Sequence, residues 1–253
     1  MRPGRARRSL ALAGRLLAAA AIIAGASGRL PHLVLTQAIL SSLLTMVAAP
    51  FALLDRDADA PRRWSIPAFP AVALMCVGTV FLQAPPVVSV IGEGGLLSAV
   101  ALTALLVMAM GFWSVVLPPA RLRGLAGAGY VIAGSLPISM PAMFLLTMPR
   151  DIYAAFHAAA ASPLPGMDDQ IYSGFVLFAS VKITLFVAFT FLFLSAASEK
   201  VDEGPDNGGG GREFSKPPTL PGWVKALLQG EPTVDEPGVA EPAAPVPTGA
   251  GSR

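Results

Sequence analysis

The residues best suited to chemistry in this chain are two histidines and an acidic pair. His32 and His157 are the only histidines, and Asp168-Asp169-Gln170 begins 11 residues after His157. Histidine is the commonest metal ligand and titrates near neutral pH. A zinc or copper site usually needs three or four ligands, so these two histidines would require further donors.

Two methionines are candidates for those donors. Met140 and Met143 are three residues apart and would share one face of a helix. Thioether sulfur is a soft ligand that suits Cu(I), so a candidate metal site consists of His32, His157, Met140 and Met143. Methionine is also a common filler of apolar space, and His157 also fits a membrane-parallel helix that binds nothing. The residue types leave both interpretations open.

The elements that must position these residues are transmembrane helices. Hydrophobic residues make up 54% of the chain and charged residues 13%, about half the usual share of a soluble domain. A helix needs about 20 apolar residues to cross a bilayer. The segments that meet or nearly meet this length are 9–27, 33–53, 67–84, 95–117, 124–148 and 171–195. The composition therefore predicts an all-α, polytopic membrane helix bundle with about six transmembrane helices.

Prolines and glycines divide this bundle and end it. Pro85-Pro86 predicts a helix break after the third segment, and Pro137 with Pro141 predicts a kink in the fifth. Residues 196–253 are rich in proline and glycine and carry more acidic than basic side chains. Such a segment cannot bury enough apolar area to fold alone, so we expect a disordered cytoplasmic tail.

Basic residues of the loops predict the orientation. One set of loops holds Arg2, Arg5, Arg7, Arg8, Arg56, Arg62, Arg63, Arg121, Arg123 and Lys200, whereas the alternate set holds Arg29 and Arg150. The positive-inside rule therefore places both termini in the cytoplasm, which agrees with an even number of spans. Residues 1–26 also fit a cleavable signal peptide, and cleavage would leave the orientation of the other five helices unchanged.

The same topology predicts a polar cluster on the outer face. His32 and Gln37 begin the second helix there, Asp169 and Gln170 immediately precede the sixth, and His157 lies in the loop before it. Polar side chains at this depth are stabilised by one another rather than by lipid. Such a cluster would be a metal site or a hydrogen-bonded structural lock. If the second and sixth helices are not neighbours, each of these side chains would instead contact lipid headgroups and water.

Two basic residues lie inside hydrophobic segments. Lys182 is the only lysine within a span, about midway along 171–195, and Arg15 lies in the first segment. A charge at the bilayer centre costs about 3 kcal/mol on insertion scales. Lys182 should therefore make a polar contact inside the bundle or extend along the helix surface toward the interface.

The sequence contains no pattern that indicates enzymatic activity or nucleic-acid binding. No Gly-rich phosphate loop or nucleophile motif is present, and the only cysteine, Cys76, lies in an apolar run. A net charge of +2 gives no indication of a nucleic-acid partner. We therefore expect a membrane protein without enzymatic activity.

An ordered set of short motifs over residues 9–195 resembles the CtaG-like family of cytochrome c oxidase assembly factors. The matching pieces are His32-Leu33 with Gln37 and Ala49-Pro50, Phe112-Trp113 with Pro118-Pro119, Tyr153, and Asp169-Gln170 with Gly174 and Leu177-Phe178. The chain departs from the family at Ala38, where a second histidine is usual, and at Leu177-Phe178, where the family has Met-Trp. Residues 95–113 also lack the family's histidines, and no segment of this sequence matches the first helix usual in the family.

The resemblance implies a helper in the maturation of a haem–copper terminal oxidase in the bacterial inner membrane. Copper delivery to that oxidase is one version of this role, and an oxidase subunit would be the partner. The alternative class is a small-solute or metal-ion transporter, which Lys182, the proline-broken helices and the outer-face Met and His residues would suit.

Overall fold

The computed structural model describes residues 3–31, 33–55, 66–117, 122, 124–160 and 163–202. Within these residues it is built of helices alone, and it contains one π-helical turn, η1. The elements are α1 (Pro3–Ala26), α2 (Val34–Ser42), η1 (Leu43–Ala48), α3 (Ala49–Ala52), α4 (Ala68–Leu82), α5 (Pro85–Gly92), α6 (Gly95–Trp113), α7 (Gly124–Thr147), α8 (Ala154–Ala160) and α9 (Gly166–Asp202). The prediction of an all-α bundle is therefore confirmed.

The helices have the length and composition of membrane spans. In the described part of the chain, five helical segments are long and apolar enough to cross a bilayer, and α4 with α5 makes a sixth if the bent pair counts as one span. Large apolar side chains such as Phe69, Leu96 and Phe186 are exposed, as lipid contact requires. The protein is thus a multi-pass membrane protein, and the lipid bilayer is its solvent.

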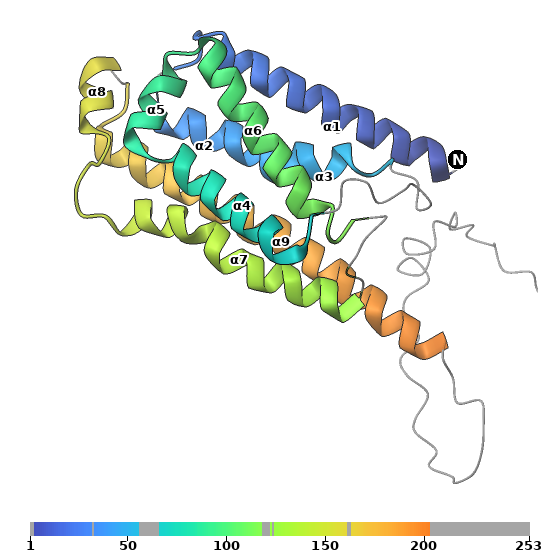
Figure 1. Cartoon of the computed structure of the whole chain (residues 1–253). Helices are drawn as coiled ribbons and strands as arrows, with labels where there is room; N and C mark the ends of the chain where they lie inside the picture. Colours follow the sequence, from blue (N-terminus) through green and yellow to red (C-terminus); the bar gives the residue numbers. More distant parts are fainter. Residues whose placement is uncertain are drawn as a thin grey trace, which may run out of the picture. The chain divides into compact units, whose positions relative to one another are not determined.

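Successive long helices run in alternating directions through the bundle (Figure 1). The start of α1 and the end of α9 lie at one end, and α5 and α8 lie at the opposite end (Figure 1). We call the end that carries α5 and α8 the α8 end. All the functional candidates between Tyr153 and Gln170 lie near it.

Helix α9 is longer than predicted at both ends. It begins at Gly166 rather than 171, so Asp168 and Asp169 belong to its first turn instead of preceding it. Carboxylates are stabilised there by the free N–H groups and the helix dipole. The helix also continues to Asp202, so residues 196–202 extend α9 and do not belong to a tail. The rest of the predicted tail lies outside the described residues.

The second span changes its hydrogen-bond register at η1. The N–H of Ala49 donates to the carbonyl of Leu44, five residues back, and the next residue, Pro50, has no N–H. The carbonyl of Thr45 is therefore left without a donor from its own helix. The indole N–H of Trp113 on α6 donates to this carbonyl, with 2.8 Å between Nε1 and the oxygen.

The predicted break between α4 and α5 creates a second free carbonyl. Helix α4 ends at Leu82, and α5 is bent from it by 72°. Pro85 and Pro86 occupy the first positions of α5, where their missing N–H groups cost least. The carbonyl of Gln83, at the break, accepts a hydrogen bond from the Tyr153 hydroxyl at 2.6 Å.

Helix α7 runs through both of its prolines as one continuous helix. Pro141 cannot donate to the carbonyl of Pro137, four residues back. The thiol of Cys76 on α4 points to that carbonyl, with 3.4 Å from Sγ to the oxygen. All three carbonyls are thus satisfied by a side chain from another part of the bundle, as a bilayer without water requires.

Helix α1 packs closely against its neighbours. A Cβ added to Gly14 would lie 2.7 Å from the backbone nitrogen of Ala52, so glycine allows the two helices to approach. Arg15, one of the two basic residues inside hydrophobic segments, pairs with Asp55 at 2.6 Å, just after α3. Arg15 is therefore neutralised by a carboxylate near the end of a span and is not an isolated intramembrane charge.

Candidate functional site

The first member of the site is Asp169, in the first turn of α9. Its carboxylate accepts the backbone N–H of Val34 at 2.8 Å and that of Leu35 at 2.9 Å. Helix α2 has no capping side chain of its own at Leu33, and the first N–H groups of any helix need an acceptor. Asp169 is fully buried and supplies this cap from 135 residues away.

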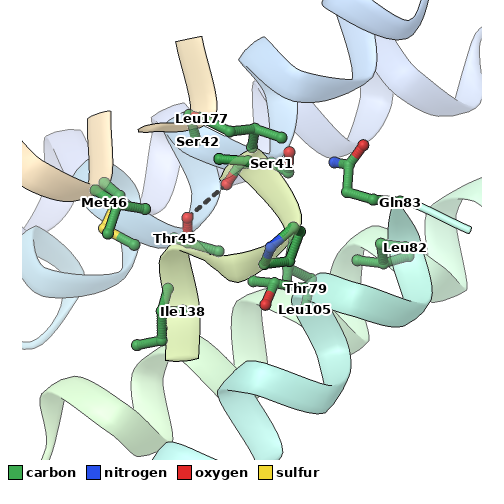
Figure 2. Close-up of a pocket in the computed structure, with 13 residues that line it drawn as sticks. Ser41, Ser42, Thr45, Met46, Thr79, Leu82, Gln83, Leu105, Ile138 and Leu177 are labelled. Carbon is green, nitrogen blue, oxygen red and sulfur yellow. Dashed lines mark hydrogen bonds between the residues drawn. The ribbon is translucent and has the colours of Figure 1, made fainter. Parts of the chain in front are cut away.

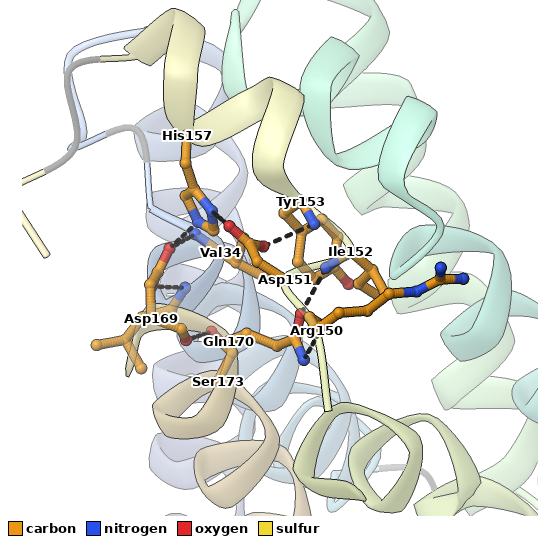
Figure 3. A network of polar contacts seen from close by, with 10 residues as sticks. Val34, Arg150, Asp151, Ile152, Tyr153, His157, Asp169, Gln170 and Ser173 are labelled. Carbon is orange, nitrogen blue, oxygen red and sulfur yellow. Dashed lines mark hydrogen bonds and ion pairs between the residues drawn. The ribbon is translucent and has the colours of Figure 1, made fainter. Parts of the chain in front are cut away.

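His157 connects Asp169 to a second carboxylate (Figure 3). Its Nε2 lies 2.9 Å from Asp169 Oδ2, and its Nδ1 lies 2.8 Å from Asp151 Oδ2. The histidine side chain is only 8% exposed. We call Asp151, His157 and Asp169 the carboxylate–histidine bridge.

The number of protons in the bridge follows from its two hydrogen bonds. Each bond needs one proton, and a neutral imidazole carries only one N–H. Either His157 is an imidazolium between two carboxylates, or it is neutral and one aspartate is protonated. Both arrangements carry one net negative charge, which the N–H groups at the start of α2 stabilise.

Gln170 joins the same site to the end of α7. Its Oε1 accepts the N–H of Ile152 at 2.9 Å, and its Nε2 donates to the carbonyl of Arg150 at 3.3 Å (Figure 3). The same Nε2 also donates to the carbonyl of Leu145 at 3.2 Å. The residue is fully buried. Gln170 therefore pairs with the backbone N–H and C=O groups of the segment that leaves α7 and turns toward α8.

Tyr153 extends the network toward α4 and α5. Asp151 Oδ1 accepts the N–H of Tyr153 at 2.8 Å, while the tyrosine hydroxyl reaches the Gln83 carbonyl. Burial, and then the carboxylates of Asp169 and Asp151, raise the pKa of Tyr153 above its usual range. The hydroxyl therefore keeps its proton and remains a donor.

Two glycines of α9 permit these close contacts. A Cβ at Gly166 would overlap Asp151 Oδ2 and would lie 2.6 Å from His157 Nδ1. A Cβ at Gly174 would lie 3.0 Å from the Leu145 side chain and 3.1 Å from the Ala142 carbonyl. The first glycine leaves room for the carboxylate–histidine bridge, and the second lets α9 pack tightly on α7.

The structure brings some of the predicted site residues together and leaves others apart. His157, Asp169 and Gln170 lie in one network, whereas Asp168 is exposed beside it. Gln37 is half-buried, and no side-chain hydrogen bond joins it to the described residues. His32 lies outside the described residues. Lys182 lies apart from this network, on the surface between α7 and α9.

The candidate metal ligands are not assembled within the described residues. Met140 and Met143 are 64% and 46% exposed on α7, and both nitrogens of His157 face carboxylates. Among these residues no group of three or more His, Cys, Asp or Glu side chains could hold a metal ion. The arrangement around His157 is a hydrogen-bonded lock. The copper site that includes His32 stays a prediction.

Several members of the network were not predicted. The sequence gives no role to Asp151 or Gly166 and no contact to Tyr153, and it likewise gives none to Trp113 beside η1. Asp151 and His157 are six residues apart around a short helix, which is a spacing that permits contact but does not indicate it. Nothing local in the sequence marks Trp113 as the donor for Thr45.

A second polar feature lies in the interior, beside η1 and the end of α4 (Figure 2). A cavity of about 20 Å³, the size of one water molecule, is lined by Ser41, Ser42, Thr45, Thr79 and Gln83 together with apolar side chains. The hydroxyls of Ser41, Thr45 and Thr79 donate to backbone carbonyls of their own helices. Gln83 is 7% exposed, and its Oε1 has no hydrogen-bond partner among the described residues. Within the described part of the chain, Gln83 thus contributes an unpaired acceptor to the lining of the cavity.

Comparisons of this chain with family models, with curated proteins and with solved structures find no match. The fold and the site define its class, a multi-pass α-helical membrane protein whose α8 end is closed by a buried polar lock.

Proposed function

We propose that this chain is a non-enzymatic factor of the bacterial inner membrane that assists the assembly of a haem–copper cytochrome c oxidase. One observation carries the proposal: residues that resemble the CtaG-like pattern are also residues that join distant helices. Asp169 caps α2, and Trp113 supports η1. A pattern whose members make the interhelical contacts favours a common fold, and the step from fold to function is made by that resemblance.

The described residues support a scaffold role better than copper delivery. His157 could bind a metal only by giving up a hydrogen bond to Asp151 or Asp169. Met140 and Met143 are exposed on the surface of α7, where thioethers suit contact with lipid or with a partner helix. An oxidase subunit or assembly intermediate is therefore the proposed partner.

Deletion of the gene in its bacterium is expected to lower the oxidase activity of the membranes and their reduced-minus-oxidised haem spectrum. The wild-type gene should restore both. The double variant Met140→Leu/Met143→Leu should restore them equally well if the role is that of a scaffold, because leucine preserves the apolar surface. Partial restoration that added copper completes would favour copper delivery. Normal oxidase in the deletion strain would contradict the proposal.

We also propose that the start of α1 and the end of α9 face the cytoplasm. Both lie at the same end of the bundle, and the loops predicted at that end carry most of the basic residues (Figure 1). Alkaline phosphatase fused after residue 200 should be inactive, whereas the same fusion after residue 160, at the α8 end, should be active. The reverse pattern would overturn this orientation.

A second candidate, a transporter of small solutes or metal ions, is favoured by the interior cavity. Broken helices whose ends line a central site are typical of transporters, and Gln83 lies at such a break. The cavity has room for a water-sized occupant only. Metal uptake into vesicles that contain the purified protein, lost in Gln83→Leu, would favour this candidate over the scaffold.

A further inference from the structure

Lys182 is a cation in the middle of the longest apolar helix. It follows Asp169 by 13 residues, which places its backbone about 20 Å along α9 from the buried cap of α2. The hydrocarbon core of a bilayer is about 30 Å thick. The side chain leans toward the helix N-terminus, and its Nζ lies 5.4 Å from the centre of the Phe178 ring. The ammonium group therefore lies deep in the hydrocarbon region.

No carboxylate of the described residues neutralises this charge. The ion pairs found among them involve Arg15 and His157, and Lys182 takes part in none. Its interaction with the Phe178 ring supplies only partial compensation. An unpaired ammonium at this depth is costly, so a group from outside the bundle would stabilise it.

The lysine lies at the edge of a groove between α7 and α9. The groove has a volume of about 540 Å³, and its lining includes Ile132 and Ser135 from α7 and Lys182, Ile183 and Phe186 from α9. Ile132, Ile183 and Phe186 are 51%, 65% and 67% exposed, so the groove opens to the outside of the bundle. Apart from Lys182, Ser135 is the only polar side chain in the groove lining.

The adjoining face of α7 allows another helix to approach closely. Gly129 and Ala133 are four residues apart and exposed, and a Cβ added to Gly129 would meet nothing within 4 Å. Small residues at this spacing are typical of faces where transmembrane helices pack together. The groove and this face form one surface, which we call the Lys182 face.

The sequence and the depth limit what can cover the Lys182 face. A second copy of the chain cannot supply a carboxylate there, because no acidic residue occurs in 94–150 or 170–198, nor in any other span. Lipid phosphates lie at the interface, far from a charge near the bilayer centre. A transmembrane helix can hold a carboxylate at a fixed depth, and pairing would relieve the cost of both charges.

We propose that the Lys182 face docks a transmembrane helix of a partner protein that carries an aspartate or glutamate near mid-membrane. The carboxylate accepts hydrogen bonds from the Lys182 ammonium, while the rest of the helix packs on Gly129, Ala133, Ser135 and the apolar groove. This inference uses a different surface from the polar lock and does not depend on the role in oxidase assembly.

The test uses a defined probe in place of the unidentified partner. A leucine–alanine transmembrane peptide with one central glutamate, and its twin with glutamine, are labelled with an acceptor fluorophore. The full-length protein carries the donor at Leu136→Cys, which is exposed beside the groove, in a Cys76→Ser background that keeps a donor for the Pro137 carbonyl. Energy transfer in phosphatidylcholine vesicles then reports binding.

We expect the glutamate peptide to bind about tenfold more tightly than its glutamine twin, as strong polar contacts between membrane helices allow. Lys182→Gln should abolish this preference, and Ser135→Leu should weaken both peptides by filling the groove. Arg15→Gln is the matched control, because it removes a basic residue that already has a partner, and it should leave the preference unchanged.

Four outcomes would overturn the proposal. The wild-type protein could bind both peptides equally, a result that does not depend on whether any variant folds. Alternatively, Lys182→Gln could keep the preference for the glutamate peptide. The preference could disappear when palmitate or phosphatidylglycerol is added in excess, which would assign the groove to an anionic lipid. Self-association that depends on Lys182 would assign it to a second copy.

Discussion

Replacement of Asp169 by alanine is expected to lower the unfolding temperature of the detergent-solubilised protein by on the order of 10 °C. The change removes the acceptor for two backbone N–H groups of α2 and the partner of His157 Nε2 in one step. All of these groups are buried or half-buried, so water replaces the lost oxygens poorly. Breaking a buried charged network by removing one partner typically costs 3–5 kcal/mol.

Asp169→Asn should give a smaller loss. An asparagine side chain can accept at only one of the two positions, so one N–H of Val34 or Leu35 would meet another donor. An unsatisfied buried group of this kind costs about 1–3 kcal/mol. Comparison of the two variants separates the contribution of the hydrogen bonds that cap α2 from the contribution of the negative charge.

Asp168→Ala is the matched control. Asp168 lies in the same turn of α9 and is exposed, so its interaction with the helix dipole contributes a few tenths of a kcal/mol to about 1 kcal/mol. Its unfolding temperature should stay within a few degrees of wild type. Equal losses from Asp168→Ala and Asp169→Ala would show that the dipole, and not the lock, accounts for the effect.

Trp113→Phe is expected to destabilise the protein by about 2–4 kcal/mol. Phenylalanine lacks the N–H that the Thr45 carbonyl accepts, and the smaller ring leaves space at a residue that is 2% exposed. The same interaction holds η1 against α6. Thermal unfolding of the purified variant in detergent measures the loss.

Pro50→Ala provides the internal test of that explanation. It returns an N–H five residues after Thr45, the spacing of a π-helical hydrogen bond. In the double variant Trp113→Phe/Pro50→Ala, the Thr45 carbonyl regains a donor. The combined loss of stability should therefore be smaller than the sum of the two single losses by about 1 kcal/mol. Strictly additive losses would mean that Trp113 acts through its size alone.

The spans could be predicted because the length and hydrophobicity of a segment are local properties. Both the break at Pro85-Pro86 and the absence of strands in the described residues follow from the same local rules. The predicted start of α9, residue 171, lies five residues after the observed start because Asp168 and Asp169 are acidic. Charged residues usually mark the end of a span, but carboxylates are also favoured in a first turn.

The site could be predicted only in outline. Topology indicates that the loop with His157 and the start of α9 share one membrane level, and in the structure His157 contacts Asp169 directly. Which face of each helix meets which neighbour depends on packing between segments more than a hundred residues apart, as with Asp169 and Val34. No local pattern carries that information.

By itself the sequence determined which segments are apolar and long enough to cross a membrane, and where proline removes a donor from a helix. Proline has no N–H in any context, so Pro50, Pro85-Pro86 and Pro141 must disturb their helices. Only the tertiary structure decided how the carbonyls freed there are satisfied. Trp113, Tyr153 and Cys76 reach them from other elements, because in a bilayer the donor must come from whichever side chain the packing brings close.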